Sequence, residues 1–272
     1  VVADSPGVRW PTGGWPMTSV LDGKRAVVTG AAGALGSAIA SRFVAEGVAA
    51  IALVDIDANH VQASAESLRS QAPDRSFEVH EVVVDVTDHD AVLARYQEIT
   101  AAFGGLDISV NNAGIVAPSG RIHNVSPEDF RQVLDVNLMG IFNTMKASII
   151  AMRGAGGGSV VNTASVAGFT NWTHNSPYGA SKAAVIQLTK IAAAEYANDQ
   201  IRVNCVSPGT FVTSFHDDLP AGAMDGVLAR HPLGRFGETP EIASAYVYLA
   251  SDQTSWVTGT NLVFDGGMSV SQ

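Results

Sequence analysis

Short apolar runs alternate with longer segments of helical character along most of the chain. The runs are rich in β-type residues and lie at 25–29, 50–54, 78–84, 106–110, 158–163, 201–206 and 261–264. The helical segments lie at about 34–46, 58–71, 88–103, 126–152, 177–197 and 239–251, and three of them are expected to be capped by Asp88, Ser126 and Thr239. The runs 26–28 and 82–84 are continuously apolar, which is typical of strands covered on both faces. The pattern predicts an α/β fold with a doubly wound parallel sheet and crossover helices.

Length and composition fit a single domain over 17–272. The 272 residues are 46% apolar and include 27 glycines, which is typical of a compact globular chain. Sixteen basic against 26 acidic side chains give a net charge of −10 without a basic cluster, so a nucleic-acid partner is disfavoured. No apolar stretch approaches ~18 residues and no basic-then-apolar segment opens the chain, so we expect a cytoplasmic protein without a membrane partner. The only cysteine, Cys205, lies in an apolar run and is expected to be a buried structural thiol.

Two segments depart from this rhythm. Residues 1–16 are rich in Pro, Gly and Trp, precede Met17, and are expected to form an N-terminal extension or arm. Residues 209–236 mix aromatics, histidines, glycines and prolines after the sixth strand. We interpret this second segment as a substrate-covering loop, with an ordinary irregular connection as the alternative.

A glycine-rich turn joins the first predicted strand to the first predicted helix. It contains Gly30, Gly33 and Gly36, whose small size lets the backbone approach a phosphate at a helix N-terminus, although tight packing alone also explains such a turn. Asp55 ends the second strand, nineteen residues after Gly36. A carboxylate there accepts hydrogen bonds from both ribose hydroxyls and repels a 2′-phosphate. The spacing predicts NAD rather than NADP as the cofactor, with a helix-capping Asp55 as the alternative.

Tyr178 and Lys182 lie four residues apart in a predicted helix, and Ser165 lies thirteen residues before the tyrosine. On a helix this spacing puts the phenol and the ammonium on one face, where the cation favours phenolate. Work as an acid or base at neutral pH requires the tyrosine pKa to fall well below its ordinary value of ~10. The trio predicts the coupled transfer of a proton and a hydride. The alternative is a surface tyrosine beside a solvated lysine.

With these motifs placed, residues 20–268 resemble the short-chain dehydrogenase/reductase family. The resemblance rests on Thr29-Gly30-x-x-x-Ala34-x-Gly36, Asn111-Asn112-Ala113-Gly114, Asn137, Ser165, Tyr178-x-x-x-Lys182, Asn204 and Pro208-Gly209-x-x-x-Thr213. Ala34 departs from the family pattern, which has a glycine at this position. The resemblance implies a Rossmann-like sheet of seven strands in the order 3-2-1-4-5-6-7. It also implies a homotetramer in which segments 126–152 and 177–197 pair with their copies.

The resemblance further implies a role for each matching side chain. Tyr178 is the acid/base, and Ser165 orients the substrate oxygen. Lys182 holds the nicotinamide ribose and lowers the tyrosine pKa, while Asn137 anchors a water that links the lysine to solvent. The implied cofactor contacts are Gly30, Ala34, Leu35, Gly36, Asp55, Ile56, Asp85, Val86, Asn112, Ala113, Gly114, Tyr178, Lys182, Pro208, Gly209, Val212 and Thr213.

These features together predict an NAD-dependent oxidoreductase that interconverts a small secondary alcohol and its ketone. Phe169, Trp172, Phe211 and Phe215 are expected to line an apolar pocket suited to a cyclic or aromatic substrate, with ordinary packing or a subunit contact as the alternative. The sequence has no Cys and His cluster that would predict a metal site. The alternative functions are a 3-oxoacyl-thioester reductase, a sugar or polyol dehydrogenase, and a non-catalytic dinucleotide-binding subunit.

Overall fold

Seven parallel strands form one sheet in a computed structural model that describes residues 19–72, 76–116, 120–211 and 224–271. Their order is β3-β2-β1-β4-β5-β6-β7, which confirms the order that the family resemblance implies. The bounds are β1 (Arg25–Thr29), β2 (Ala50–Asp55), β3 (Glu78–Val83), β4 (Ile108–Asn111), β5 (Gly158–Thr163), β6 (Ile201–Pro208) and β7 (Asn261–Phe264). Residues 1–16 and 212–223 lie outside the described residues, so the expected arm and the middle of the expected substrate loop remain predictions.

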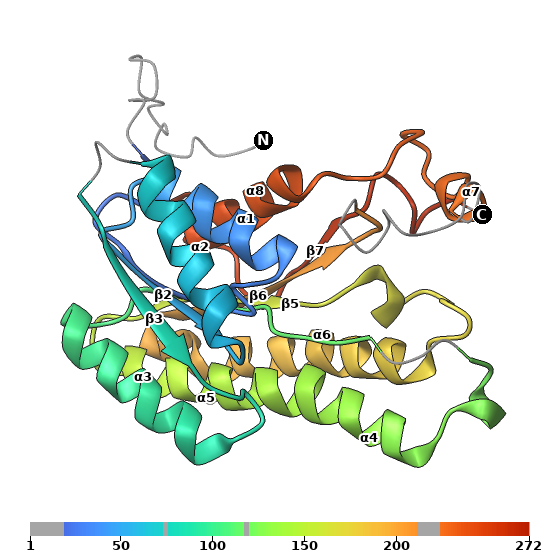
Figure 1. Cartoon of the computed structure of the whole chain (residues 1–272), viewed down its shortest axis with the longest axis horizontal. Helices are drawn as coiled ribbons and strands as arrows, with labels where there is room; N and C mark the ends of the chain where they lie inside the picture. The colour runs from blue at the N-terminus through green and yellow to red at the C-terminus, as the bar shows by residue number, and fades with distance from the viewer. Residues whose placement is uncertain (1–18, 73–75, 117–119, 212–223, 272) are drawn as a thin grey trace, which may run out of the picture.

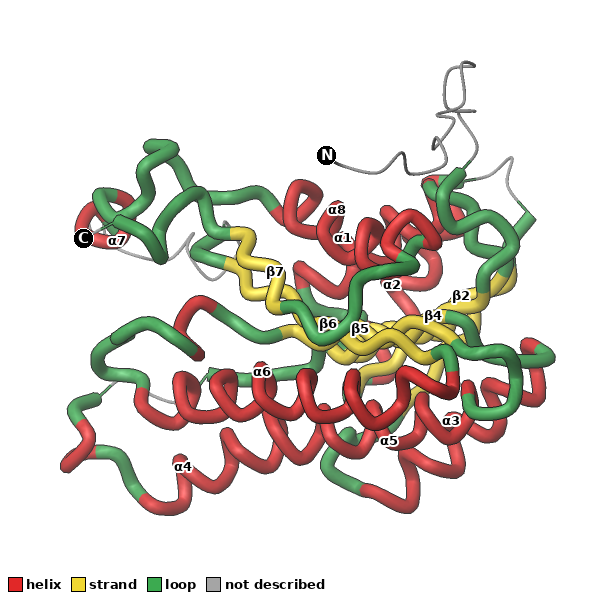
Figure 2. The backbone as a smooth tube through the Cα atoms, turned by 180° about the vertical axis from the view of Figure 1, so that it is seen from behind, coloured by secondary structure: helices red, strands yellow, loops and turns green. Residues whose placement is uncertain are grey.

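Helices cover both faces of the sheet (Figure 1). One layer contains α1 (Ala34–Ala45), α2 (Ala58–Gln71) and α8 (Thr239–Ala250), and the other contains α3 (His89–Phe103), α4 (Pro127–Leu134), α5 (Ile141–Met152) and α6 (Ser176–Tyr196). The short α7 (Asp225–Leu228) lies near the C-terminal end of the chain (Figure 2). Val27 and Val28 of β1 are both fully buried, one in each of two core clusters on opposite faces. This explains why β1 is continuously apolar. The same expectation for 82–84 was wrong, because β3 is an edge strand and Val83 is 45% exposed.

The predicted helix 126–152 is confirmed as one helical segment over Pro127–Met152, but it is not α-helical throughout. A π-helical segment at Asp135–Gly140 separates α4 from α5. Such bulges occur often at functional sites, and this one brings a main-chain glycine against the β3–α3 connection. A Cβ on Gly140 would lie 2.6 Å from Cγ2 of Val86, so the close approach requires glycine. The segment Pro127–Met152 is long and apolar enough to cross a membrane by length and composition, but 56% of its most apolar window is buried inside the fold, as in a core helix.

Two of the three expected caps are confirmed. The Asp88 carboxylate accepts from Ala91 N–H at 3.0 Å to cap α3, and the Ser126 hydroxyl accepts from Asp129 N–H at 3.0 Å to cap α4. The expectation for Thr239 was wrong. Glu238 is the N-cap of α8 and forms a capping box with the side chain three residues into the helix.

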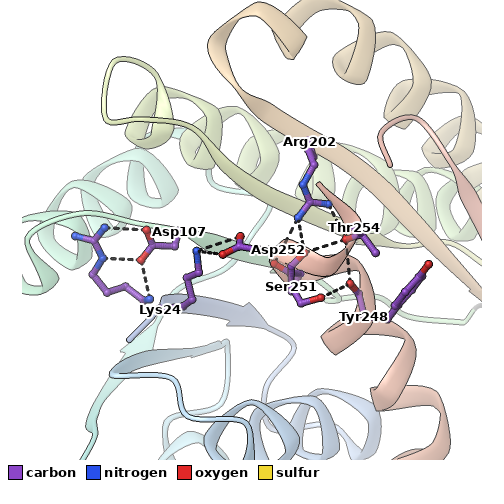
Figure 3. A network of polar contacts seen from close by, with 9 residues as sticks. Lys24, Asp107, Arg202, Tyr248, Ser251, Asp252 and Thr254 are labelled. Atoms are coloured by element: carbon purple, nitrogen blue, oxygen red, sulfur yellow. Dashed lines mark hydrogen bonds and ion pairs between the residues drawn. The ribbon is translucent and has the colours of Figure 1, made fainter. Parts of the chain in front are cut away.

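A polar network at the amino ends of the strands fixes the C-terminal end of α8 (Figure 3). Arg202, the second residue of β6, donates to the main-chain oxygens of Leu249 at 2.9 Å and Ser251 at 3.1 Å. The ammonium of Lys24 lies 3.0 Å from the carboxylate of Asp252. The two Arg202 hydrogen bonds satisfy main-chain carbonyls that the end of a helix leaves without partners. They anchor α8 at the edge of the sheet opposite the carboxyl ends of the strands.

Candidate active site

A cavity of about 750 Å³ opens at the carboxyl edge of the sheet. The sequence-predicted residues that line it are Gly30, Ala34, Leu35, Gly36, Asp55, Ile56, Asp85, Val86, Asn112, Ala113, Gly114, Ser165, Tyr178, Lys182, Pro208, Gly209 and Phe211. They converge because the strands are parallel, so the turns that follow the strands meet at one edge. The predicted contacts Val212 and Thr213 lie outside the described residues.

The glycine turn leaves main-chain N–H groups facing this cavity. Gly30 has φ of +63°, and a Cβ there would lie 2.9 Å from the Cα of Ala113. A Cβ on Gly36 would collide with the carbonyl oxygen of Gly30, so this position also requires glycine. The N-cap of α1 is Gly33, which has no side chain to cap the first helical N–H groups, and the first turn carries no acidic residue. Such an open helix N-terminus is a good site for an anion.

Asp55, the last residue of β2, contacts this turn at Ala32. One carboxylate oxygen accepts from Ala32 N–H at 3.1 Å and the other accepts from Ile56 N–H at 2.8 Å. The alternative role of Asp55 as the cap of α2 was wrong, because the cap is Asp57, which accepts from Asn59 N–H at 2.9 Å. Asp55 is therefore a cavity-lining carboxylate that the main chain holds in place.

Ser165, Tyr178 and Lys182 line the same cavity. Ser165 follows β5, and its side chain lies near the Tyr178 phenol, whose pKa it lowers. Tyr178 and Lys182 lie one turn apart in α6, which begins with Pro177 in its first turn. The ammonium of Lys182 is buried, donates to the main-chain oxygen of Thr163 at 2.7 Å, and lies 5.6 Å from the centre of the Tyr178 ring.

The electrostatics of this trio differ from the sequence-based expectation. Burial raises the pKa of Tyr178, and the hydrogen bond from Ser165 offsets only part of that increase. Burial also lowers the pKa of Lys182 to about 8. The expected lowering of the tyrosine pKa by the lysine is absent, because the ammonium donates to the Thr163 carbonyl and lies beside the ring. The protein groups alone therefore favour a protonated Tyr178 at neutral pH.

Asn137 lies behind the cavity wall in the π-helical segment. Its side-chain oxygen accepts from Ile115 N–H at 2.7 Å, and its amide donates to the Ile115 carbonyl at 2.8 Å and to the Ser181 hydroxyl at 3.3 Å. A Cβ on Gly114 would lie 3.1 Å from that oxygen and 3.6 Å from the ammonium of Lys182. Asn137 thus joins the β4 end to α6 beside the lysine, and its implied role as a water anchor stays a prediction.

Of the three described aromatic residues that were expected in a substrate pocket, only one lines the cavity. Phe211 lines the cavity, whereas Phe169 and Trp172 are not among its lining residues. Phe169 is 46% exposed, and the Trp172 ring lies 5.4 Å from the guanidinium of Arg230. Phe215 lies outside the described residues.

Sequence reasoning missed several cavity-lining residues, namely Ala32, His60, Val84, Ile115, Val116, Gln132, Val136, Thr163 and Ala164. Most of them flank motifs that were recognised. His60 and Gln132 lie on helices, so only the packing of α2 and α4 brings them to the cavity. No periodicity in the sequence distinguishes them from other surface positions of the same helices.

A doubly wound sheet whose carboxyl edge carries a phosphate-type turn and a Ser, Tyr and Lys group is typical of oxidoreductases that bind a dinucleotide. The comparisons with known proteins agree. A family model described as enoyl-(acyl carrier protein) reductase matches residues 30–269. The chain therefore belongs to the short-chain dehydrogenase/reductase family, whose members bind a nicotinamide dinucleotide.

Relatives with different named activities match nearly the whole chain. Cis-4-hydroxycyclohexanecarboxylate dehydrogenase of Sinomonas cyclohexanicum is 40% identical over 242 residues, covering 89% of this chain and 95% of its own. 3-Oxoacyl-(acyl-carrier-protein) reductase of Thermotoga maritima is 38% identical over 250 residues, covering 92% and 99%. The crystal structure of levodione reductase matches with a TM-score of 0.88 at 34% identity, covering 93% of this chain and 100% of that one.

Proposed function

We propose that the protein interconverts a small cyclic secondary alcohol and its ketone, with NAD(H) as the hydride carrier. The observation that carries the proposal is the meeting of Ser165, Tyr178 and Lys182 with the glycine turn and Asp55 around one cavity. Two of the relatives are a hydroxycyclohexanecarboxylate dehydrogenase and levodione reductase, and this supports a cyclic substrate.

The residues around the cavity fit a nicotinamide dinucleotide. The open N-terminus of α1, which no side chain caps, suits the pyrophosphate. Asp55 would accept from the hydroxyls of the adenosine ribose. Lys182 would hold the ribose next to the nicotinamide. When bound, the oxidised nicotinamide supplies the acceptor for the hydride.

The chain's own residues would handle the proton and the substrate oxygen. In alcohol oxidation, Tyr178 takes the hydroxyl proton while Ser165 hydrogen-bonds to the same oxygen and stabilises its developing charge. In ketone reduction, Tyr178 returns the proton. Because burial raises the tyrosine pKa, the neutral phenol needed for reduction is already present at neutral pH. Oxidation is therefore expected to accelerate as the pH rises, whereas reduction is not.

The charge around the ribose end of the cavity supports the proposal of NAD rather than NADP. The described lining residues there include the carboxylates of Asp55 and Asp85, and the only lysine or arginine among all the described lining residues is Lys182. A 2′-phosphate would meet negative charge at Asp55 without a lysine or arginine partner among the described lining residues.

Replacing Asp55 by alanine is expected to raise kcat/KM with NADP relative to NAD by about tenfold or more, which corresponds to ~1.4 kcal/mol. The ratio is measured with one substrate and both cofactors. Asp57→Asn is the matched control, because Asp57 does not line the cavity and asparagine can still cap α2. A wild-type preference for NADP would contradict the assignment.

A 3-oxoacyl-thioester reductase is the second candidate, supported by the relative from Thermotoga maritima. A substrate panel separates the functions: cyclohexanol and cyclohexanone derivatives, an acetoacetyl thioester and a polyol, each with both cofactors. The proposal expects the cyclic compounds to give the highest kcat/KM. A preference for the thioester or the polyol would replace the substrate assignment. A protein that binds the dinucleotide but turns over no compound in the panel would support the non-catalytic alternative.

We also propose a homotetramer, supported by exposed apolar side chains on the helices expected to pair. Phe142 and Ile150 of α5 are 37% and 53% exposed, and Ile191 of α6 is 45% exposed. Light scattering is expected to give four times the chain mass of 28.2 kDa. Ile150→Glu should lower that mass, whereas Val270→Glu, a control at an aliphatic residue beyond β7 that is 81% exposed, should not. A wild-type monomer would contradict the proposal.

A further inference from the structure

Thr163, the last residue of β5, joins three parts of the site. Its hydroxyl lies 2.8 Å from the hydroxyl of Tyr246 and 3.2 Å from the side-chain oxygen of Asn112. Its main-chain oxygen accepts from the ammonium of Lys182 at 2.7 Å. Neither Thr163 nor Tyr246 belongs to the motifs recognised in the sequence. One residue therefore contacts the lysine, the end of β4 and a helix of the opposite layer.

The direction of these hydrogen bonds can be assigned from the groups involved. The side-chain amide of Asn112 donates to the carbonyls of Thr29 at 3.2 Å and Gly30 at 3.3 Å, so its oxygen is the acceptor facing Thr163. The Thr163 hydroxyl donates its only proton to that oxygen. Tyr246 must then donate to Thr163. The chain runs in one direction, from Tyr246 through Thr163 and Asn112 to the glycine turn.

The side-chain amide of Asn112 is in direct contact with the glycine turn. A Cβ on Gly30 would lie 3.0 Å from the side-chain nitrogen of Asn112, so there is no free space between them. A change in the orientation of the Asn112 amide would remove both donors from the carbonyls of Thr29 and Gly30. The rotamer of Thr163 therefore bears on the shape of the turn.

Tyr246 is well placed to fix that rotamer. Its side chain is fully buried in α8, whose C-terminal end is anchored by Arg202. The side chains of successive strand residues point to opposite faces, so Asn162 faces Thr189 of α6 at 2.9 Å while Thr163 faces α8. Burial raises the pKa of Tyr246, so its hydroxyl stays a donor throughout the working pH range.

We infer that Tyr246 is a positioning residue for dinucleotide binding: its hydroxyl holds Thr163 in the orientation that, through Asn112, keeps the glycine turn in its binding shape. The inference rests on the proposed dinucleotide site, but it assigns a role to a side chain that does not line the cavity. The same hydrogen bond from Tyr246 holds Thr163, whose main-chain oxygen accepts from Lys182.

The test measures the dissociation constant of NADH by fluorescence titration, which needs no substrate. Tyr246→Phe keeps the ring and removes only the donor, so we expect a weakening of about 3- to 10-fold, the loss of one hydrogen bond. Thr163→Val should weaken binding at least as much, and Thr163→Ser should retain wild-type affinity. The double variant Tyr246→Phe with Thr163→Val should bind like Thr163→Val alone, because both changes break one chain.

Tyr96→Phe is the matched control. Tyr96 is also almost fully buried, and its hydroxyl lies 3.5 Å from that of Ser109, but it packs in the core cluster on the other face and does not line the cavity. Removal of the Tyr96 hydroxyl is expected to change the melting temperature without changing the affinity for NADH. Wild-type affinity in Tyr246→Phe, or equal weakening in Tyr96→Phe, would overturn the inference. A wild-type protein that binds no dinucleotide would instead overturn the proposed function.

Discussion

Replacing Tyr178 by phenylalanine is expected to lower kcat by about 10²–10⁴-fold, because the variant lacks the hydroxyl that we propose exchanges a proton with the substrate oxygen. The described contacts of the glycine turn do not include the Tyr178 phenol, so the dissociation constant of NADH should stay within about threefold of the wild type. Steady-state kinetics and fluorescence titration give the two values.

Tyr196→Phe is the control for this variant. Tyr196 ends the same helix, and its ring lies 6.0 Å from the guanidinium of Arg153, a contact that phenylalanine retains. It should keep wild-type kcat. Substantial turnover in Tyr178→Phe would show that another group exchanges the proton.

Replacing Lys182 by methionine is expected to raise stability while it removes activity. The ammonium is buried with one hydrogen bond to Thr163, and burial lowers its pKa from 10.5 to about 8. Keeping the charge inside the fold therefore costs free energy at neutral pH. After allowance for the lost hydrogen bond, the free energy of unfolding of the variant should be higher by about 2 kcal/mol, which corresponds to roughly 4–8 °C in melting temperature.

The pH dependence of this gain has a definite sign. Below about pH 8 the lysine is protonated in both the folded and the unfolded state, so the wild type carries the full cost. As the pH rises from about 8 towards 10.5, the folded protein releases its proton first and the cost disappears. The stability difference between Lys182→Met and wild type should therefore shrink across that interval. Lys190→Met, at an exposed lysine of the same helix, should show no gain at any pH. Equal melting temperatures of Lys182→Met and wild type at pH 7 would show that the buried ammonium does not destabilise the fold.

Much of the site was predictable because it follows from strand ends. Asp55 and Ser165 come directly after apolar runs, and a parallel sheet brings such positions to one edge. The resemblance gave the strand order, which the structure confirms. Spacing also put Tyr178 and Lys182 on one face of a helix.

The remaining features depend on contacts between distant residues. The pattern of 126–152 is continuously helical, so nothing in it indicates the π-helical segment or the close approach of Gly140 to Val86. The direction of the Tyr178 pKa shift was missed because it is set by burial of the phenol in the folded chain. The expected counter-effect of Lys182 is absent, since its ammonium donates to Thr163, nineteen residues away in sequence. The link from Tyr246 to Thr163 joins two layers of the fold and has no local signal.

The most direct test of the central claim follows the hydrogen on the carbinol carbon. The wild-type protein is incubated in ordinary water with NAD and the best alcohol of the panel, labelled with deuterium at that carbon, and the NADH formed is analysed by mass spectrometry. Direct hydride transfer between substrate and cofactor held in one cavity predicts NADH that carries the deuterium. Unlabelled NADH, with its hydrogen taken from water, would contradict the account.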